Sequence, residues 1–315
     1  MSLPASLPRL PLTVMLAAAL ALSACSSEPE PSTPAASTDS SADAAANDSA
    51  PAEPAPAPVP DPAELLESML KNPARSPENV ARDASRHPRE TLSFFGLHPT
   101  QTVIEITPGA GWYTEILAPY LRSHGHYIAA TIAPGSAPMG NVRAPLEQAN
   151  KTFHAKLMGD PSAYDQAAVV KFDRAAPVFG PPESADLVLT FRNVHNWRTQ
   201  PMSPQGMFSA FHAVLKPGGI LGVVEHRANA DVAEGDKSGY LSENQVIALA
   251  TAAGFLLEEK SEINANPKDT KDHPNGVWTL PPTLKVPAGE DVQKYKDIGE
   301  SDRMTLRFVK PATTP

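Results

Sequence analysis

Two glycines that follow a short β-type run are the first residues whose spacing could do chemistry. The run Thr102–Thr107 is rich in β-branched residues, and Gly109 and Gly111 come shortly after it. Because glycine has no Cβ, a ligand can approach its backbone closely. A glycine-rich turn between a strand and a helix is typical of sites that bind a nucleotide or a nucleoside cofactor. This turn is therefore the first candidate for a ligand site.

His195 is the candidate for general-base catalysis. It follows the apolar run Ala185–Phe191, within the sequence Phe-Arg-Asn-Val-His-Asn-Trp that ends at Trp197. A neutral imidazole can take a hydroxyl proton near neutral pH. Alternatively, His195 only holds the loop in shape. Arg192 and Trp197 could bind an acidic or aromatic substrate, or could simply pack the loop.

Glu225 and His226 end a further apolar run, Ile220–His226. Their place predicts a contact with substrate, because ligands bind at the carboxyl ends of parallel strands. A metal held by His195, Glu225 and His226 is conceivable. Their spacing matches no established ligand pattern, so we predict no metal.

The segments between these residues alternate between strand and helix patterns. Such alternation predicts an α/β fold with a mainly parallel sheet covered by helices on both faces. The expected strands are Thr102–Thr107, His126–Ile132, Val169–Asp173, Ala185–Phe191, Ile220–His226, Phe255–Ile263 and Met304–Lys310. The expected helices between them are Trp112–Ser123, Ala144–Lys151, Pro204–Leu215 and Ser242–Ala253.

The glycine turn fits a nicotinamide dinucleotide site poorly. The pattern Gly-x-Gly-x-x-Gly would place its third glycine at Thr114. The acidic residue expected at the end of the second strand is replaced by Thr131-Ile132. Since both features are needed for that cofactor, an oxidoreductase is disfavoured.

Four blocks of sequence, in order along the chain, resemble class I S-adenosylmethionine (SAM) methyltransferases. Glu105, Gly109 and Gly111 match the acidic residue and the last two glycines of their cofactor loop. Thr107 stands in place of the first glycine. The other matching blocks are Ala185–Thr190, Leu215–Leu221 and Ala252–Phe255. The resemblance implies a Rossmann-like class I methyltransferase fold with a mostly parallel, seven-stranded sheet.

More closely, the chain resembles a group of predicted bacterial exported methyltransferases. The shared runs are Glu105–Pro119, Phe191–Trp197, and Asp302-Arg303 before a final strand that continues into Lys310-Pro311. This resemblance implies no particular substrate.

The resemblance implies SAM as the cofactor and gives the site residues their roles. Glu105 would orient backbone amides or the amino end of SAM. Asp173 would accept a hydrogen bond from the adenine amine, unless it is a solvated loop carboxylate. Thr131 stands where the family has the acid that binds the ribose, and a neutral hydroxyl would bind it more weakly. The other implied cofactor-binding residues are Thr107, Gly109, Gly111, Tyr113, Phe191 and Asn193.

The run Val194–Trp197 resembles the Leu-His-Asp-Trp run of plant-type O-methyltransferases, in which the histidine is the catalytic base. It implies this role for His195 and slightly favours O-methylation, although Asn196 replaces the aspartate of those enzymes. SAM is made in the cytoplasm. An alternative function is therefore a non-catalytic ligand-binding or scaffold lipoprotein with a degenerate methyltransferase fold.

The N-terminus resembles a bacterial lipoprotein signal peptide. Arg9 precedes the short apolar segment Leu12–Leu22, and Leu-Ser-Ala-Cys ending at Cys25 matches the lipobox. Residues 1–24 would be removed, and Cys25, the only cysteine, would be lipidated. Ser26 after the cysteine favours the outer membrane. We therefore expect a lipid-anchored envelope protein on the periplasmic side.

Composition divides the remaining chain into a tether and a domain. Residues 25–60 are rich in Pro, Ala and Ser and cannot bury enough apolar surface to fold. Residues 61–311 would form the methyltransferase-like domain, with helices in 61–100 that could cover a pocket and a long loop at 264–300 that could gate it. The net charge of −9, without a Lys/Arg run, argues against a nucleic-acid partner and favours a small-molecule substrate.

Overall fold

The structure, a computed structural model, describes residues 58–198 and 202–312. The signal peptide, Cys25 and residues 25–57 of the expected tether lie outside the described residues. Their assignments stay predictions. Among the residues that are described, no helix is long and apolar enough to cross a membrane.

A seven-stranded sheet with the strand order β3-β2-β1-β4-β5-β7-β6 lies at the centre. Its parallel strands are β1 (Thr102–Ile106), β2 (His126–Ile132), β3 (Ala168–Phe172), β4 (Ala185–Phe191) and β5 (Leu215–His226). β7 (Arg303–Val309) runs antiparallel between β5 and β6 (Leu256–Ser261). The chain order reverses between β1 and β4, so a ligand crevice is expected at the carboxyl ends of these two strands.

The predicted α/β fold is confirmed, and most strand bounds agree within two residues. Val103, Ile104 and Ile106 are at most 1 % exposed, as expected for a strand covered on both faces. One difference concerns β5, which begins at Leu215 rather than Ile220. The predicted turn at 216–219 lies inside this strand as an irregularity, and the positive φ of 79° at Gly218 fits that bend.

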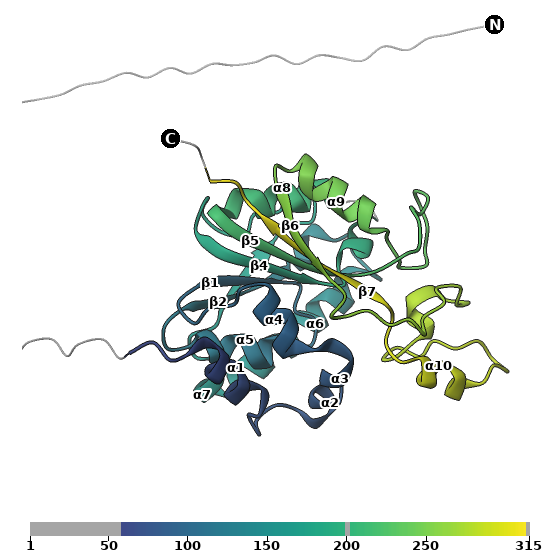
Figure 1. Ribbon diagram of the computed structural model, residues 1–315, viewed down its shortest axis with the longest axis horizontal. Coiled ribbons are helices and arrows are strands. Elements are labelled where there is room, and N and C mark those ends of the chain that lie inside the picture. The colour runs from purple at the N-terminus through teal and green to yellow at the C-terminus, as the bar shows by residue number, and fades with distance from the viewer. Residues whose placement is uncertain (1–57, 199–201, 313–315) are drawn as a thin grey trace, which may run out of the picture. The chain divides into compact units, whose positions relative to one another are not determined.

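Helices cover both faces of the sheet (Figure 1). One apolar cluster includes side chains of α1 (Pro62–Leu70), α4 (Pro88–Phe94), α5 (Thr114–Leu121) and α6 (Arg143–Gly159). The other includes side chains of α8 (Pro204–Val214) and α9 (Glu243–Ala252). Short helices α2 (Pro77–Val80), α3 (Asp83–Arg86) and α7 (Pro161–Tyr164) complete the first layer.

The 264–300 segment is packed rather than free. It is irregular apart from the 3₁₀ turn η3 (Gly276–Thr279) and α10 (Val292–Ile298). Its Asp269 carboxylate accepts hydrogen bonds from the Tyr240 hydroxyl at 2.9 Å and from the Asp302 backbone N–H at 2.8 Å. In Figure 1 the segment lies beside the end of the sheet where β7 begins. It therefore stands next to the carboxyl end of β5, which β7 pairs with.

Candidate functional site

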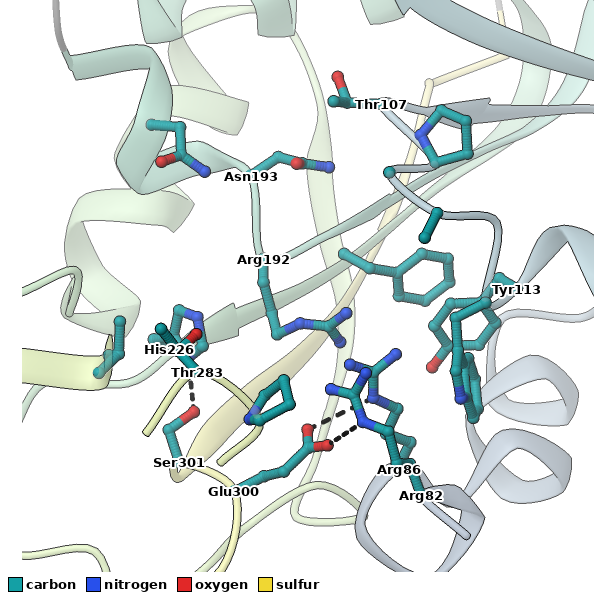
Figure 2. Close-up of a pocket in the computed structure, with 18 of the residues that line it drawn as sticks. Arg82, Arg86, Thr107, Tyr113, Arg192, Asn193, His226, Thr283, Glu300 and Ser301 are labelled. Atoms are coloured by element: carbon teal, nitrogen blue, oxygen red, sulfur yellow. Dashed lines mark hydrogen bonds and ion pairs between the residues drawn. The ribbon is translucent and has the colours of Figure 1, made fainter. Parts of the chain in front are cut away.

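A cavity of about 360 Å³ opens at the carboxyl ends of β1, β4 and β5. Three stretches of chain meet there: the strand ends, the α2–α3 region, and the 264–300 segment with the residues just after it. Figure 2 shows side chains from all three pointing into it. The lining residues used below are Arg82, Arg86, Glu105, Thr107, Gly109, Tyr113, Phe191, Arg192, Asn193, His195, His226, Trp278, Glu300 and Ser301. The predicted edge of the sheet is thus where a cavity lies.

The backbone is strained at the first residue after each of the two central strands. Thr107 follows β1 with φ of 50°, and Arg192 follows β4 with φ of 58°. Such angles are uncommon for residues with a side chain, and they gather at ligand-binding positions. The Thr107 Oγ1 atom is buried and has no hydrogen-bond partner in the described part of the chain. A polar atom left in this state is costly unless a ligand or water satisfies it.

Gly109 leaves open space in the glycine turn. Its φ is +62°, and a Cβ built on it would meet nothing within 4 Å. It lines the main cavity and also a neighbouring one of about 60 Å³, which extends towards Thr131 and the Phe153 side chain of α6. Gly111 differs, because its Cβ would lie 3.3 Å from Phe153 and from Lys156. The structure therefore assigns Gly111 to the packing of α6 rather than to the lining of the main cavity.

His195 and Glu225 form a buried hydrogen-bonded dyad. His195 lies in the 3₁₀ turn η2 (Val194–Arg198) after β4, and Glu225, in β5, is 0 % exposed. The Glu225 Oε1 atom lies 2.9 Å from His195 Nδ1, and Oε2 accepts from the His195 backbone N–H at 3.3 Å. A carboxylate at Nδ1 holds the proton on that nitrogen and leaves Nε2 free to take another. The geometry is that of an oriented general base.

His226 lies beside this dyad in a neutral form. Its ring centroid is 5.1 Å from that of His195, and its Nδ1 is hydrogen-bonded to the Ser301 hydroxyl. Burial lowers the pKa of His226 well below its usual value, and the nearby His195 and Arg192 lower it further. His226 therefore stays uncharged at neutral pH.

Ligand atoms of His195, Glu225 and His226 lie within 4.8 Å of one another. The Glu225 carboxylate already accepts two hydrogen bonds from His195 and a third from the His226 backbone N–H at 2.7 Å. Nearby arginines also disfavour a divalent cation. These contacts support the prediction of no metal, which the structure leaves untested.

Aromatic rings form one wall of the cavity. Tyr113 and Phe191 stack with centroids 3.6 Å apart and an interplanar angle of 12°. Trp112 meets the Tyr113 ring edge-on at 4.5 Å, and the Arg86 guanidinium lies 4.6 Å from the centroid of the Trp112 ring. This wall couples the glycine turn to the N-terminal helices.

Glu105 is buried at the base of the cavity. Its Oε2 atom accepts hydrogen bonds from the Tyr127 hydroxyl at 2.6 Å and the Thr114 hydroxyl at 2.9 Å. Burial raises the pKa of Glu105 to about 7, although both hydroxyls oppose the shift. The expected backbone amides are thus replaced by two hydroxyls that join β2 and α5 to β1.

Glu105 should make the protein less stable as pH rises. The folded chain keeps a proton, up to about pH 7, that an unfolded chain releases near the ordinary pKa of 4.5. The contribution of Glu105 to stability is therefore fully present below pH 4.5 and is lost as pH rises to 7. The pKa difference of about 2.5 corresponds to about 3 kcal/mol. We expect Glu105→Gln to remove this part of the pH dependence in urea unfolding at pH 5 and pH 8. An unchanged dependence in the variant would contradict the assignment.

An arginine cluster that sequence analysis did not foresee closes the far side of the cavity (Figure 2). Three arginines donate hydrogen bonds to the carboxylate oxygens of Glu300. The distances are 2.8 Å from Arg82 Nε, 3.3 Å from Arg86 Nε and 3.0 Å from Arg303 Nη1. Burial alone would raise the pKa of Glu300, but the arginines hold it at about 2. Burial, helped by repulsion from Arg192, lowers the pKa of Arg86 to about 9.

Five predicted site residues are not in the lining of the main cavity: Gly111, Thr131, Asp173, Trp197 and Glu225. The structure favours the packing role for Trp197, because its ring is 1 % exposed and packs against Phe208 and Phe211 in the core. Glu225 lies behind His195 and reaches the cavity only through it. Asp173 is exposed and caps its own turn, its Oδ1 accepting from the Ala175 N–H at 2.7 Å. This geometry favours the solvated loop carboxylate.

Comparisons with known proteins define the fold. No protein-family model matches the chain, and no curated protein is similar to it in sequence. The [4+2]-cyclase SpnF is similar in structure, with a TM-score of 0.51 and 16 % identity over 82 % of this chain and 99 % of that one. A SAM-dependent methyltransferase from Aquifex aeolicus has a TM-score of 0.47 and 15 % identity over 79 % and 98 % of the two chains. The similarity to SpnF supports the Rossmann-like α/β fold that the sequence predicts.

Proposed function

We propose that the chain is a SAM-dependent methyltransferase that acts on a small or envelope-associated molecule, with transfer to oxygen preferred. One observation carries the proposal. The open glycine turn and His195, which Glu225 orients from behind, line a single cavity at the point where the strand order reverses. We further propose that lipid on Cys25 holds the enzyme on the periplasmic side of the envelope, the outer membrane being favoured by Ser26.

Several groups in the cavity fit SAM. The unsatisfied Thr107 hydroxyl and the vacant space at Gly109 would receive the amino-acid part of the cofactor. Tyr113, Phe191 and Asn193 would bound the methyl-bearing sulfur, while Thr131 would lie towards the ribose. When bound, SAM supplies a methyl group that is already reactive, so the protein has chiefly to align the acceptor with it.

The dyad would remove the proton of the acceptor. His195 Nε2 takes the hydroxyl proton as the oxygen gains its methyl group, and the ring becomes an imidazolium. Glu225, hydrogen-bonded to Nδ1, keeps the ring in place and stabilises its positive charge. Neutral His226 beside it adds no second positive charge.

A valine at position 109 should abolish cofactor binding. Gly109→Val places a side chain in the open space of the turn, so we expect SAM and S-adenosylhomocysteine to bind at least about 100-fold more weakly, judged by the clash and the strain of positive φ. Isothermal titration of the purified protein measures this. Gly235→Val is the matched control, because Gly235 also has positive φ and free space but does not line the cavity. A folded wild type that binds neither ligand at millimolar concentration would refute the methyltransferase.

The alternative is a non-catalytic ligand-binding or scaffold lipoprotein. It is favoured by the 60 Å³ cavity on the side of Thr131, which has space for only a few water molecules. Leu146 and Phe153 of α6 would have to shift for an adenosine to enter there. The fold alone does not decide, because a similar structure is named for a cyclase. Titration with S-adenosylhomocysteine separates the two functions.

A further inference from the structure

We infer that Arg192, Arg82 and Arg86 form a subsite for an anionic group, a carboxylate or a phosphate, on the molecule that accepts the methyl group. The identity of this molecule as an acceptor rests on the proposed function. The anion site itself rests on the arrangement of charges described below.

Positive charge exceeds negative charge around the cavity. Three arginines line it, against two glutamates. Arg303, 2 % exposed, lies directly behind and shares the Glu300 carboxylate with Arg82 and Arg86. Glu105 holds a proton up to about pH 7 and so offsets little of this charge in slightly acidic conditions. Buried charge without a partner is costly, and an incoming anion would offset that cost.

Within residues 58–198 and 202–312, the Arg192 guanidinium has no ion-pair partner. Its Nη1 atom is buried without a hydrogen-bond partner, as is Nη2 of Arg82. Figure 2 shows the Arg192 side chain extending across the cavity towards Arg82 and Arg86. Like charges brought together in this way are expected where an anion binds between them, because guanidinium groups bind carboxylates and phosphates through paired hydrogen bonds.

The backbone holds Arg192 in this place at a cost. Its φ of 58° is disfavoured for arginine, and its N–H donates to the Val224 carbonyl at 2.7 Å. Strained positions persist where surrounding contacts fix them, and they gather at functional sites. An arginine on a strained backbone, with no side-chain partner among the residues that the structure describes, is better explained by ligand binding than by stability.

Part of the remaining wall is apolar and suits the body of a small molecule. Trp278, Val277, Pro281 and Pro282 contribute from the 264–300 segment, opposite the Tyr113–Phe191 stack. His195 lines the same cavity. The acceptor would thus carry an anionic group for the arginines, an apolar or aromatic body, and a hydroxyl within reach of His195.

The carboxylate of SAM itself is a second possible source of the anion. The test therefore uses 4-hydroxybenzoate and its neutral counterpart 4-hydroxybenzamide, titrated into the protein with and without saturating S-adenosylhomocysteine. We expect the anion to bind better than the amide, in both conditions. Arg192→Gln should weaken the binding of 4-hydroxybenzoate about 10- to 100-fold, the range for a charge-assisted hydrogen bond. The affinity for 4-hydroxybenzamide should stay unchanged.

Two further variants keep the test decisive. Arg122→Gln is the matched control, because Arg122 forms an exposed ion pair with Asp165. It should change the affinity for neither compound. Glu300→Gln removes the carboxylate shared by three arginines, so the stabilisation of the protein by 4-hydroxybenzoate in thermal unfolding should increase. Arg192→Gln should fold, because the side chain has an unsatisfied nitrogen and no ion pair in the described chain.

Each outcome decides one question. Equal binding of anion and amide, or no effect of Arg192→Gln and Glu300→Gln, overturns the anion site. A different result would show that the arginines bind the carboxylate of the cofactor and that the inference is wrong. In that case Arg192→Gln weakens the binding of S-adenosylhomocysteine instead, and bound S-adenosylhomocysteine prevents 4-hydroxybenzoate from binding. If 4-hydroxybenzoate binds through Arg192 while S-adenosylhomocysteine does not bind at all, the anion site stands and the methyltransferase fails.

Discussion

Replacement of His195 by alanine is expected to lower turnover by about 10²- to 10⁴-fold, the usual contribution of a general base. The affinity for S-adenosylhomocysteine should stay within about twofold, because the ring contacts His226 and Trp278 rather than the glycine turn. Release of S-adenosylhomocysteine reports turnover for any acceptor, once one has been found among hydroxylated anions. The exposed His126, at the amino end of β2, gives the control variant His126→Ala, which should keep full activity.

Rescue separates a base from a merely structural histidine. The His195→Ala cavity should admit imidazole from solution, so added imidazole should restore part of the lost rate. Full activity in the variant, or a loss accompanied by weakened cofactor binding and no rescue, would contradict the assignment. A methyl acceptor that is already deprotonated needs no base. With such an acceptor, His195→Ala would lower the turnover rate only slightly.

Glu225 should act only through His195. Glu225→Gln preserves shape but removes the negative charge that stabilises the imidazolium, so we expect kcat to fall about 10- to 100-fold with KM little changed, less than the loss of the base itself. In His195→Ala the same substitution should cost almost nothing further, because residues that act as a unit are not additive. Additive losses would mean that Glu225 contributes through the fold.

The fold was predictable because its signals are local and repeated. β1 and β4 are short and largely apolar, interrupted by Glu105 in β1 and by Asp186 in β4, and a glycine turn and a helix follow β1 at the expected distance. The site at the strand ends was predictable for a topological reason. Parallel strands end at one edge, so Gly109, Arg192 and His226 had to lie near one another.

The orientation of neighbouring side chains was harder to predict. Consecutive strand residues point to opposite faces, so Glu225 and His226 could not both face the cavity as the sequence analysis proposed. Trp197 lies in the short 3₁₀ turn η2, whose buried side is set by the core around Phe208 and Phe211. Such a turn is too short for a repeating pattern of apolar residues, so the sequence does not predict which of its side chains are buried.

The arginine cluster was not predictable from local patterns. Arg82 and Glu300 are 218 residues apart and belong to segments on either side of the repeating strands and helices. Only the spacing of Arg82 and Arg86, four residues apart, hinted at a common direction. Their shared partner, Glu300, reaches them only because the 264–300 segment packs against α3 in the folded protein.

That packing should fail when Gly276 is replaced by alanine. A Cβ at Gly276 would lie 1.9 Å from the Ser238 carbonyl oxygen, and φ there is +55°. Backbone cannot yield as a flexible side chain can, so we expect a loss of about 3 kcal/mol or more in the free energy of unfolding. Because Val277 and Trp278 follow directly and line the cavity, ligand binding should weaken as well.

Gly289→Ala is the control that isolates the clash. Gly289 belongs to the same segment and has φ of +90°, but a Cβ there would meet nothing within 4 Å. It should cost only the strain of a left-handed residue, about 1–2 kcal/mol, and leave ligand binding unchanged. Urea unfolding of both variants measures the difference. Equal losses in the free energy of unfolding would show that the 264–300 segment can move away from Ser238 at little cost. A segment that moves so easily could not keep the Trp278 ring in contact with His195.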